Sequence, residues 1–263
     1  MNDMNNTLNN TYNFAEELIE KASKLILKNH KKIRNISYKK GDSNLVTNVD
    51  KEVEALIIKE IVSKYPNHSI IAEESKAQKK DPNYQWFIDP IDGTTNFAHS
   101  YPFFCTSIGF VKNNILEFGL IKDPLTNELY SARRSQGAKL NKRPIFVSKI
   151  KKLNESLLIT GFPYDKRTSK VNNLKNFCNL TLLTHGVRRD GAAALDLCYI
   201  ASGKADGYWE MKLSPWDVAA GVLILEEAGG KVSDFKGGKY NIFNKQIVAT
   251  NGLIHKELLK HLK

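Results

Sequence analysis

The sequence has few cysteines and no long apolar segment. Only three of its 263 residues are cysteine, an odd number without a C-x-x-C pair, which argues against a disulfide framework and a thiolate zinc site. No apolar run approaches the roughly 20 residues that cross a bilayer, and the Asn-rich start lacks a basic-then-apolar targeting pattern. Hydrophobic residues make up 41% of the chain, which excludes a mainly disordered protein. We therefore expect a folded, cytoplasmic protein.

The charge is positive and unevenly spread. The chain has 39 Lys and Arg against 28 Asp and Glu, a formal net charge of +11. Residues 133–175 alone hold twelve Lys or Arg and two acids, a net +10. Such a run attracts anionic partners, although it is more often a solvated surface. The segment also lacks the dense aromatic interleaving of a single-strand binder. Nucleic acid therefore stays a minor alternative.

The hydrophobic pattern predicts helices and strands in mixed order, within a single domain over residues 1–263. Helical spacing begins at Phe14, after an Asn-rich stretch that we expect to be a flexible tail at residues 1–10. Further helices are expected after a cap at Asp50 and after Ser214, where Pro follows and an acid stands at the third position. Strands are expected at 69–72, 86–88, 103–111, 117–121, 128–132, 157–160, 207–211 and 247–250, and further helices at 192–202 and from 253. The fold class is α/β or α+β.

Acidic residues follow two of the predicted buried strands. Glu73 and Glu74 come after the first, and the sequence W-F-I-D-P-I-D-G-T-T-N-F at 86–97 contains Asp89 and Asp92 on a sharp turn. Carboxylates that meet at one sheet edge repel one another strongly unless cations neutralise them. Oxygen ligands without His or Cys suit Mg²⁺, and Thr94 and Thr95 add hydroxyls where a helix start receives phosphate. Together these residues indicate a site for metal and a phosphoryl group.

Each acid also has an ordinary structural explanation. Asp89 and Asp92 fit a pair of turn residues, and Glu73 and Glu74 fit a solvated strand end. Asp217 fits a helix-capping acid three residues after Ser214, and Glu210 fits an ion-pair partner of a lysine. The functional interpretation therefore depends on all of these acids together.

Four ordered motifs resemble the inositol monophosphatase family, Mg²⁺-dependent and lithium-sensitive phosphatases of the superfamily that includes fructose-1,6-bisphosphatase. The motifs are L-V-T-N-V-D at 45–50, I-A-E-E-S at 71–75, the segment 86–97, and W-D-V-A-A-G at 216–221 followed by E-A-G-G at 227–230. The resemblance covers almost the whole chain past the first residues. It implies a layered αβαβα sandwich, a homodimer, and two or three Mg²⁺ ions per site.

The resemblance also implies roles for individual residues, and every acidic position that it implies is filled. The resemblance implies catalytic roles for three residues: Glu73, Thr94 and Asp50. The implied metal ligands are Glu73, Asp89, the carbonyl of Ile91, Asp92 and Asp217. The implied substrate contacts are Asp92, Gly93, Thr94, Thr95, Arg188, Gly191, Ala192, Ala193, Glu210 and Asp217. Lys39 aligns with a basic residue on a loop that helps to bind a further metal.

The implied reaction is hydrolysis of a small phosphate monoester by metal-activated water, with inositol 1-phosphate as the leading substrate. Fructose 1,6-bisphosphate, histidinol phosphate and a 3′-phosphoadenosine nucleotide remain alternatives, because fold and metals would be unchanged. Asp190 stands where many relatives have a small residue. It could bind sugar hydroxyls, repel a second phosphate or, in the interpretation that we favour, pair with Arg188 or Arg189. A different alternative is an RNA-associated or regulatory protein that uses the basic segment 133–175.

Overall fold

Two sheets form the framework of the protein. The computed structural model describes residues 2–30, 36–38 and 45–263. The larger sheet has the strand order β3-β4-β5-β6-β7-β8-β9 and the smaller one β11-β10-β12-β14-β13. Their strands are β3 His68–Ala72, β4 Asp81–Asp92, β5 Cys105–Lys112, β6 Ile115–Asp123, β7 Glu128–Arg133, β8 Ala138–Leu140, β9 Arg143–Pro144, β10 Leu157–Thr160, β11 Gly186–Arg188, β12 Gly207–Met211, β13 Lys231–Ser233 and β14 Gln246–Thr250. Strands β1 Ile36–Tyr38 and β2 Leu45–Thr47 pair separately.

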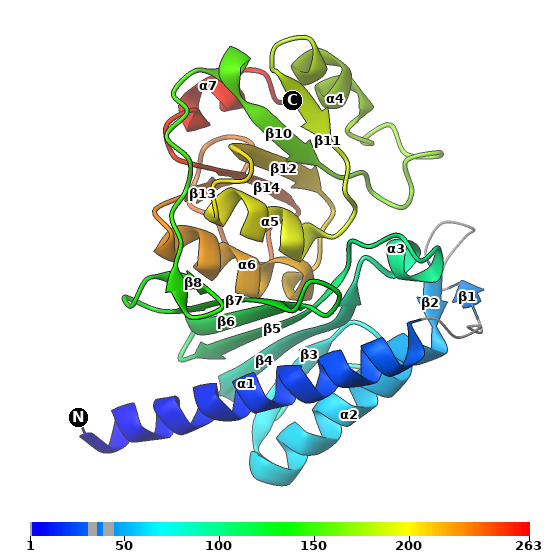
Figure 1. The fold of residues 1–263 in the computed structure, drawn as a ribbon, viewed down its shortest axis with the longest axis vertical. Coiled ribbons are helices and arrows are strands. Elements are labelled where there is room, and N and C mark those ends of the chain that lie inside the picture. Colours follow the sequence, from blue (N-terminus) through cyan, green and yellow to red (C-terminus); the bar gives the residue numbers. More distant parts are fainter. Residues whose placement is uncertain (1, 31–35, 39–44) are drawn as a thin grey trace.

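Helices lie outside and between the two sheets (Figure 1). They are α1 Asn2–Asn29, α2 Asn48–Lys64, α3 Thr94–Ala98, α4 Leu174–Thr181, α5 Ala193–Ala201, α6 Pro215–Glu227 and α7 His255–Lys260, with a 3₁₀ turn at Leu153–Glu155. Helices α1 and α2 cover the outer face of the larger sheet, α5 and α6 fill the space between the sheets, and α4 and α7 cover the smaller sheet. The αβαβα layering is therefore confirmed. None of the helices in the described ranges is long and apolar enough to span a membrane.

The first helix is longer than predicted. Helix α1 begins at Asn2, so residues 2–10 are helical in the structure, where we expected a flexible tail at residues 1–10. Leu8 packs against the core beneath α1, Thr11 is buried, and the ring of Tyr12 meets that of Phe118 edge to face at 5.5 Å between centroids. These contacts with the sheet stabilise the helix despite the low intrinsic preference of Asn for helices.

Two glycines allow α6 to lie directly on the larger sheet. Gly109 and Gly119 are paired across β5 and β6. A Cβ on Gly109 would lie 2.9 Å from that of Ala219, and one on Gly119 would lie 2.6 Å from the carbonyl oxygen of Ala220. The helix therefore approaches closer than any side chain would permit. This close approach brings the start of α6 to the edge of the sheet where β4 ends.

Strand register brings the polar strand ends together in pairs. Strands β3 and β4 are parallel, and Ala72 pairs with Ile88. The next residues, Glu73 and Asp89, therefore lie next to each other at the same edge of the sheet. Strands β10 and β12 are also parallel, and Thr160 pairs with Trp209. The next residues along the two strands, Gly161 and Glu210, therefore lie side by side at the edge of the smaller sheet that faces the larger one. The candidate site lies between these two edges.

Candidate active site

The four acids predicted as metal ligands line one cavity of about 370 Å³. Glu73, Asp89 and Asp92 come from the ends of β3 and β4, and Asp217 comes from the first turn of α6. Asp89 and Asp92 are buried. Ile91, whose backbone carbonyl the resemblance implies as a metal ligand, lines the same cavity. The prediction that carboxylates converge at one sheet edge is thus met in the structure.

Asp217 combines a structural role with its place in the cavity. Its Oδ2 accepts a hydrogen bond of 2.7 Å from the backbone N–H of Ser214, and the Ser214 side chain completes the capping box. The helix begins with Pro215, as the sequence predicts. One carboxylate oxygen therefore fixes the helix start, while the residue still lines the cavity.

Burial makes the charged form of these acids costly. The pKa values of Asp89 and Asp217 are raised well above the usual range, first by burial and then by the charge of Glu73. Burial raises the pKa of Asp92 to about 7, although the peptide N–H of Ala194 donates to its Oδ2 at 2.6 Å and opposes the shift. The cavity therefore holds more negative charge than its own hydrogen bonds stabilise.

This donor set fits divalent cations bound by oxygen. Asp89 Oδ1 is buried and has no hydrogen-bond partner among the described residues. The described ranges contain no group of three or more His, Cys, Asp or Glu side chains already arranged to hold a metal ion. Asp92 and Asp217 each accept a hydrogen bond from a peptide N–H. Carboxylate and carbonyl oxygens are the ligands that Mg²⁺ prefers. The residues that would hold such ions are Glu73, Asp89, Ile91, Asp92 and Asp217.

A hydroxyl and a buried carboxylate meet beside these acids. Thr94 Oγ1 lies 3.0 Å from Asp50 Oδ1 and 3.1 Å from the carbonyl oxygen of Ile91. The other oxygen of Asp50 accepts hydrogen bonds from the N–H, at 2.9 Å, and the hydroxyl of Thr47. Asp50 was predicted to be the cap of α2, but Thr47 is the cap and Asp50 the third helical residue of a capping box. Asp50 does not line the cavity and reaches it only through Thr94.

The turn after β4 requires glycine. Gly93 has a φ of +89°, and a Cβ there would lie 3.0 Å from the carbonyl oxygen of Phe103 and 3.2 Å from Ala192 Cβ. Thr94 and Thr95 follow in the short helix α3 and line the cavity beside Gly93. The backbone N–H groups of this turn belong to the first turn of a helix, where no intrahelical acceptor exists.

Glu210 and Gly161 form part of the opposite wall. Glu210 is buried and accepts a hydrogen bond from the hydroxyl of Tyr208. Burial raises its pKa to about 7, while the positive charges of Arg189 and Lys166 act in the other direction. A Cβ on Gly161 would lie 2.1 Å from both Glu210 oxygens. Sequence reasoning found Glu210 but missed Gly161, whose signal was its position at the end of a predicted strand.

Some predicted substrate residues lie outside the cavity. Arg188 is exposed and does not line it, whereas its neighbour Arg189 does. Gly191 and Ala193 line the cavity, and Ala192 is buried behind Gly93. Asp190 makes no ion pair within 4.0 Å with either arginine, although both arginines lower its pKa against the effect of burial. Lys39 lies outside the described residues.

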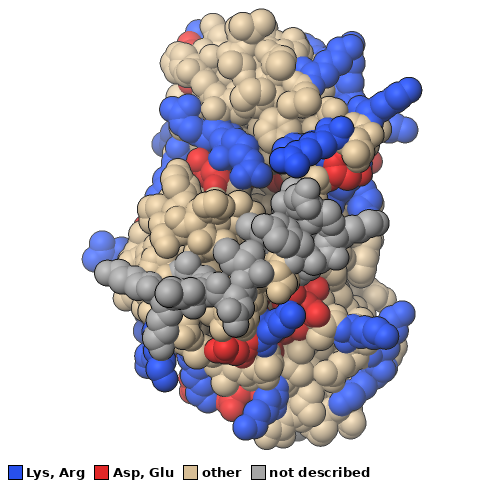
Figure 2. Space-filling model, turned by 90° about the vertical axis from the view of Figure 1, so that its right-hand side faces the viewer, with Lys and Arg blue, Asp and Glu red and all other residues tan. Residues whose placement is uncertain are grey.

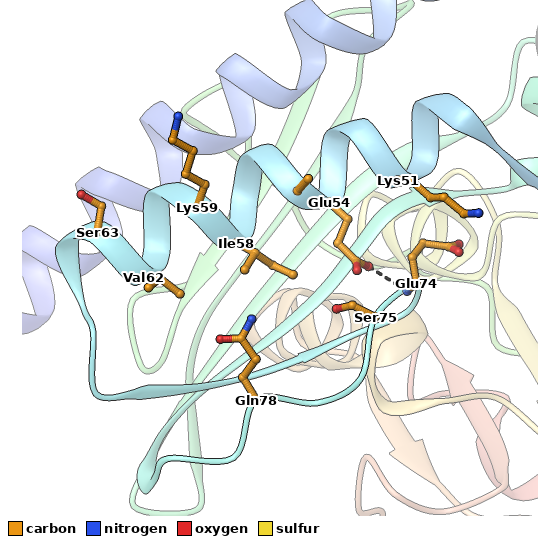
Figure 3. A pocket seen from close by; sticks show the side chains of 10 residues that line it. Lys51, Glu54, Ile58, Lys59, Val62, Ser63, Glu74, Ser75 and Gln78 are labelled. Atoms are coloured by element: carbon orange, nitrogen blue, oxygen red, sulfur yellow. Dashed lines mark hydrogen bonds between the residues drawn. The ribbon is translucent and has the colours of Figure 1, made fainter.

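A larger hollow of about 720 Å³ lies beside α2, away from the converging acids (Figure 3). Ile58 and Val62 face it, and Lys51 and Gln78 stand at its rim. Glu54 Oε2 accepts a hydrogen bond of 2.8 Å from the N–H of Glu74 across one end. This contact ties α2 to the turn that carries Glu73.

The fold and the acidic cavity define a phosphatase of the superfamily that acts on small phosphorylated substrates. The model of the inositol monophosphatase family matches residues 7–263. The chain is 47% identical to an inositol-1-monophosphatase of Synechocystis sp. over 88% of this chain and 81% of that protein. It is 42% identical to the Nus factor SuhB of Vibrio cholerae over 95% of both. An inositol monophosphatase structure from Anabaena (Nostoc) sp. PCC 7120 superposes with a TM-score of 0.88, at 44% identity, over 97% of this chain and 96% of that one.

These matches cover nearly the whole chain. The protein therefore belongs to the inositol monophosphatase family.

Proposed function

We propose that the protein is a cytoplasmic, homodimeric, lithium-sensitive phosphatase that hydrolyses inositol 1-phosphate, or a similar polyol phosphate, in a Mg²⁺-dependent reaction. The observation that carries this proposal is the cavity lined by Glu73, Asp89, Asp92 and Asp217 beside the Gly93 turn. The inositol-1-monophosphatase relative supports the substrate.

The acids would hold two or three Mg²⁺ ions with the carbonyl of Ile91. When bound, such ions supply positive charge to the phosphoryl oxygens, acidify water and stabilise a leaving oxygen. Hydrolysis of phosphate monoesters is extremely slow without catalysis, so neutralised charge and positioning must provide most of the rate.

Residues of the chain would orient the reactants. Thr94 Oγ1 donates to Asp50, which leaves the hydroxyl oxygen free to accept a hydrogen bond from the attacking water. Asp50 keeps this orientation because Thr47 holds its second oxygen. The N–H groups of Gly93, Thr94 and Thr95 would bind the phosphate, and Glu210 would accept hydrogen bonds from hydroxyls of the polyol.

The test is phosphate release from inositol 1-phosphate, fructose 1,6-bisphosphate, histidinol phosphate and adenosine 3′,5′-bisphosphate, with and without Mg²⁺. Release that needs Mg²⁺ and is abolished in Asp92→Asn supports the proposal, and the rates rank the substrates. No release from any of the four by a folded protein would refute it.

The Vibrio cholerae relative keeps a second role open, because it is named a Nus factor and not a phosphatase. Such a role would draw on the basic segment 133–175. A gel shift with generic RNA over a range of salt concentrations tests it, since binding through phosphate contacts weakens steeply with salt. No shift at moderate salt would exclude this second role.

A further inference from the structure

Asn96 links the two turns to which the proposed function assigns the substrate. We call residues 93–95, where the phosphate would bind, the phosphate turn, and residues 190–194, part of which lines the cavity, the substrate turn. Asn96 follows the phosphate turn within α3 and is buried. Its Nδ2 donates hydrogen bonds to the carbonyl oxygens of Phe103, at 2.7 Å, and Asp190, at 2.8 Å. One side-chain amide therefore joins segments that lie 94 residues apart in the sequence.

The two turns pack directly on each other around this amide. The place that a Cβ on Gly93 would occupy lies 3.0 Å from the carbonyl oxygen of Phe103 and 3.2 Å from Ala192 Cβ. A Cβ on Gly191 would in turn lie 3.4 Å from Nδ2 of Asn96. The two glycines therefore let the turns approach until only a small polar side chain fits between them.

The substrate turn has few anchors of its own. Ala192 is the N-cap of α5 and has no side-chain hydrogen bond to offer the helix start. The N–H of Ala194 donates instead to Oδ2 of Asp92, at 2.6 Å. The substrate turn is thus held at its start by Asn96 and at its end by Asp92, and these two residues stand on either side of the phosphate turn.

Ion pairs do not hold the substrate turn. Figure 2 shows Lys and Arg side chains in a row across the upper half of one face of the molecule, with acidic side chains beside them. Within the described ranges, however, no carboxylate oxygen lies within 4.0 Å of a charged nitrogen of Arg188 or Arg189, and Asp190 makes no ion pair. The placement of the substrate turn therefore depends on the hydrogen bonds of Asn96 and Asp92.

We propose that Asn96 is a positioning residue for substrate specificity, which sets the distance between the phosphate turn and the substrate turn. The inference rests on the proposed function, which places the phosphate at residues 93–95 and the polyol at Glu210. Asn96 does not itself line the cavity, so it acts through the substrate turn. Its NH₂ group supplies two N–H donors to two carbonyl oxygens, which a carboxylate of the same shape cannot do. Loss of these donors should therefore loosen the contacts with the polyol and spare those with the phosphate.

The test compares hydrolysis of inositol 1-phosphate with that of phenyl phosphate, a monoester without polyol hydroxyls, in Asn96→Asp and Asn96→Ala. The phosphate turn should stay intact in both variants, because the N–H of Phe97 donates to the carbonyl oxygen of Gly93 at 2.9 Å without help from the Asn96 side chain. Misplacement of a substrate contact by about 1 Å costs up to about 100-fold in rate. We expect kcat/KM to fall about tenfold or more for inositol 1-phosphate, mainly through KM, and less than about threefold for phenyl phosphate.

Asn251 offers a matched control away from the cavity. It is also buried, and its Nδ2 donates to the carbonyl oxygen of Ile150 at 2.8 Å and to Ser148 Oγ at 2.9 Å. Asn251→Asp removes the same two donors as Asn96→Asp and should lower stability in urea unfolding without changing the ratio of the two activities. Equal losses on both monoesters in the Asn96 variants, or no loss on either, would overturn the positioning role.

Amide hydrogen exchange tests the placement of the substrate turn without turnover. The N–H groups of residues 190–194 should exchange faster in Asn96→Asp than in the wild type and at the wild-type rate in Asn251→Asp. If Asn96→Asp does not fold, Asn96→Ser, which retains one donor, should show the same pattern with smaller changes. Unchanged exchange in a folded Asn96 variant would overturn the inference, whereas absence of Mg²⁺-dependent release from both monoesters by the wild type would overturn the proposed function.

Discussion

Replacement of Gly161 by alanine adds one methyl group next to Glu210, the residue that we propose binds hydroxyls of the polyol. The added Cβ would lie 2.1 Å from both Glu210 oxygens, whereas ordinary contacts begin at 3.4 Å, so the carboxylate must move by at least about 1.3 Å. A hydrogen bond to a substrate hydroxyl does not survive such a shift. Hydrogen bonds to charged groups contribute about 1.5–3 kcal/mol, which corresponds to about 10–100-fold in affinity. We therefore expect KM to rise by about this factor, with kcat changed much less.

The assay is steady-state hydrolysis of inositol 1-phosphate, with urea unfolding measured in parallel. Displacement of Glu210 also disturbs its bond with Tyr208, so we expect a loss of about 1–3 kcal/mol in unfolding free energy. Gly186→Ala is the matched control on the neighbouring strand, because its Cβ meets only the flexible tip of Arg188 at 3.1 Å and Leu157 at 3.9 Å. A KM for Gly161→Ala within twofold of the wild type would refute the assignment of Glu210 to the substrate.

Three further predictions concern other parts of the molecule. Thr94→Val removes the hydroxyl that Asp50 orients and should lower kcat about 100-fold or more with little change in KM, whereas Thr94→Ser should retain most activity; equal rates for both variants would exclude the role of the hydroxyl. Gly119→Ala should cost about 1–3 kcal/mol in urea unfolding, because the methyl meets the backbone of Ala220, and an unchanged midpoint would contradict the close packing of α6. Burial lowers the pKa of His255 to about 4, so below pH 6.5 this histidine is protonated in the unfolded chain but still neutral in the folded one. Thermal stability should therefore fall from pH 6.5 toward pH 4, and less steeply in His255→Gln. Parallel plots of melting temperature against pH for the two proteins would contradict this.

The sequence predicts best the parts of the fold that local chemistry determines. The capping box at Ser214 and the long apolar helix after it are confirmed, because cap, proline and acid occupy adjacent positions in the chain. The same rules gave a wrong cap at Asp50: Thr47 is the N-cap, and Asp50 is the third helical residue, whose side chain accepts a hydrogen bond from the Thr47 backbone. The start of α1 could not be predicted, since its stability comes from contacts with β6, far away in the sequence.

The candidate site follows the same distinction. The ordered motifs located the acids, but their convergence depends on the parallel register of β3 with β4 and on the glycines beneath α6. The resemblance implied Arg188, whereas Arg189 lines the cavity, because the course of the chain after β11 decides which side chain enters it. The short strands β8, β9, β11 and β13 have two to three residues each, too few for a visible alternation.

The most direct test of the central claim, that the buried carboxylates form a divalent-cation site for phosphate hydrolysis, is calorimetric titration with Mg²⁺. The wild type should bind Mg²⁺ at the concentrations that support phosphate release. Asp89→Asn, which removes the charge next to the unpartnered Oδ1, should bind it at least tenfold more weakly and lose activity. A wild-type protein that releases phosphate without binding Mg²⁺, or an Asp89→Asn variant with unchanged affinity, would contradict the claim.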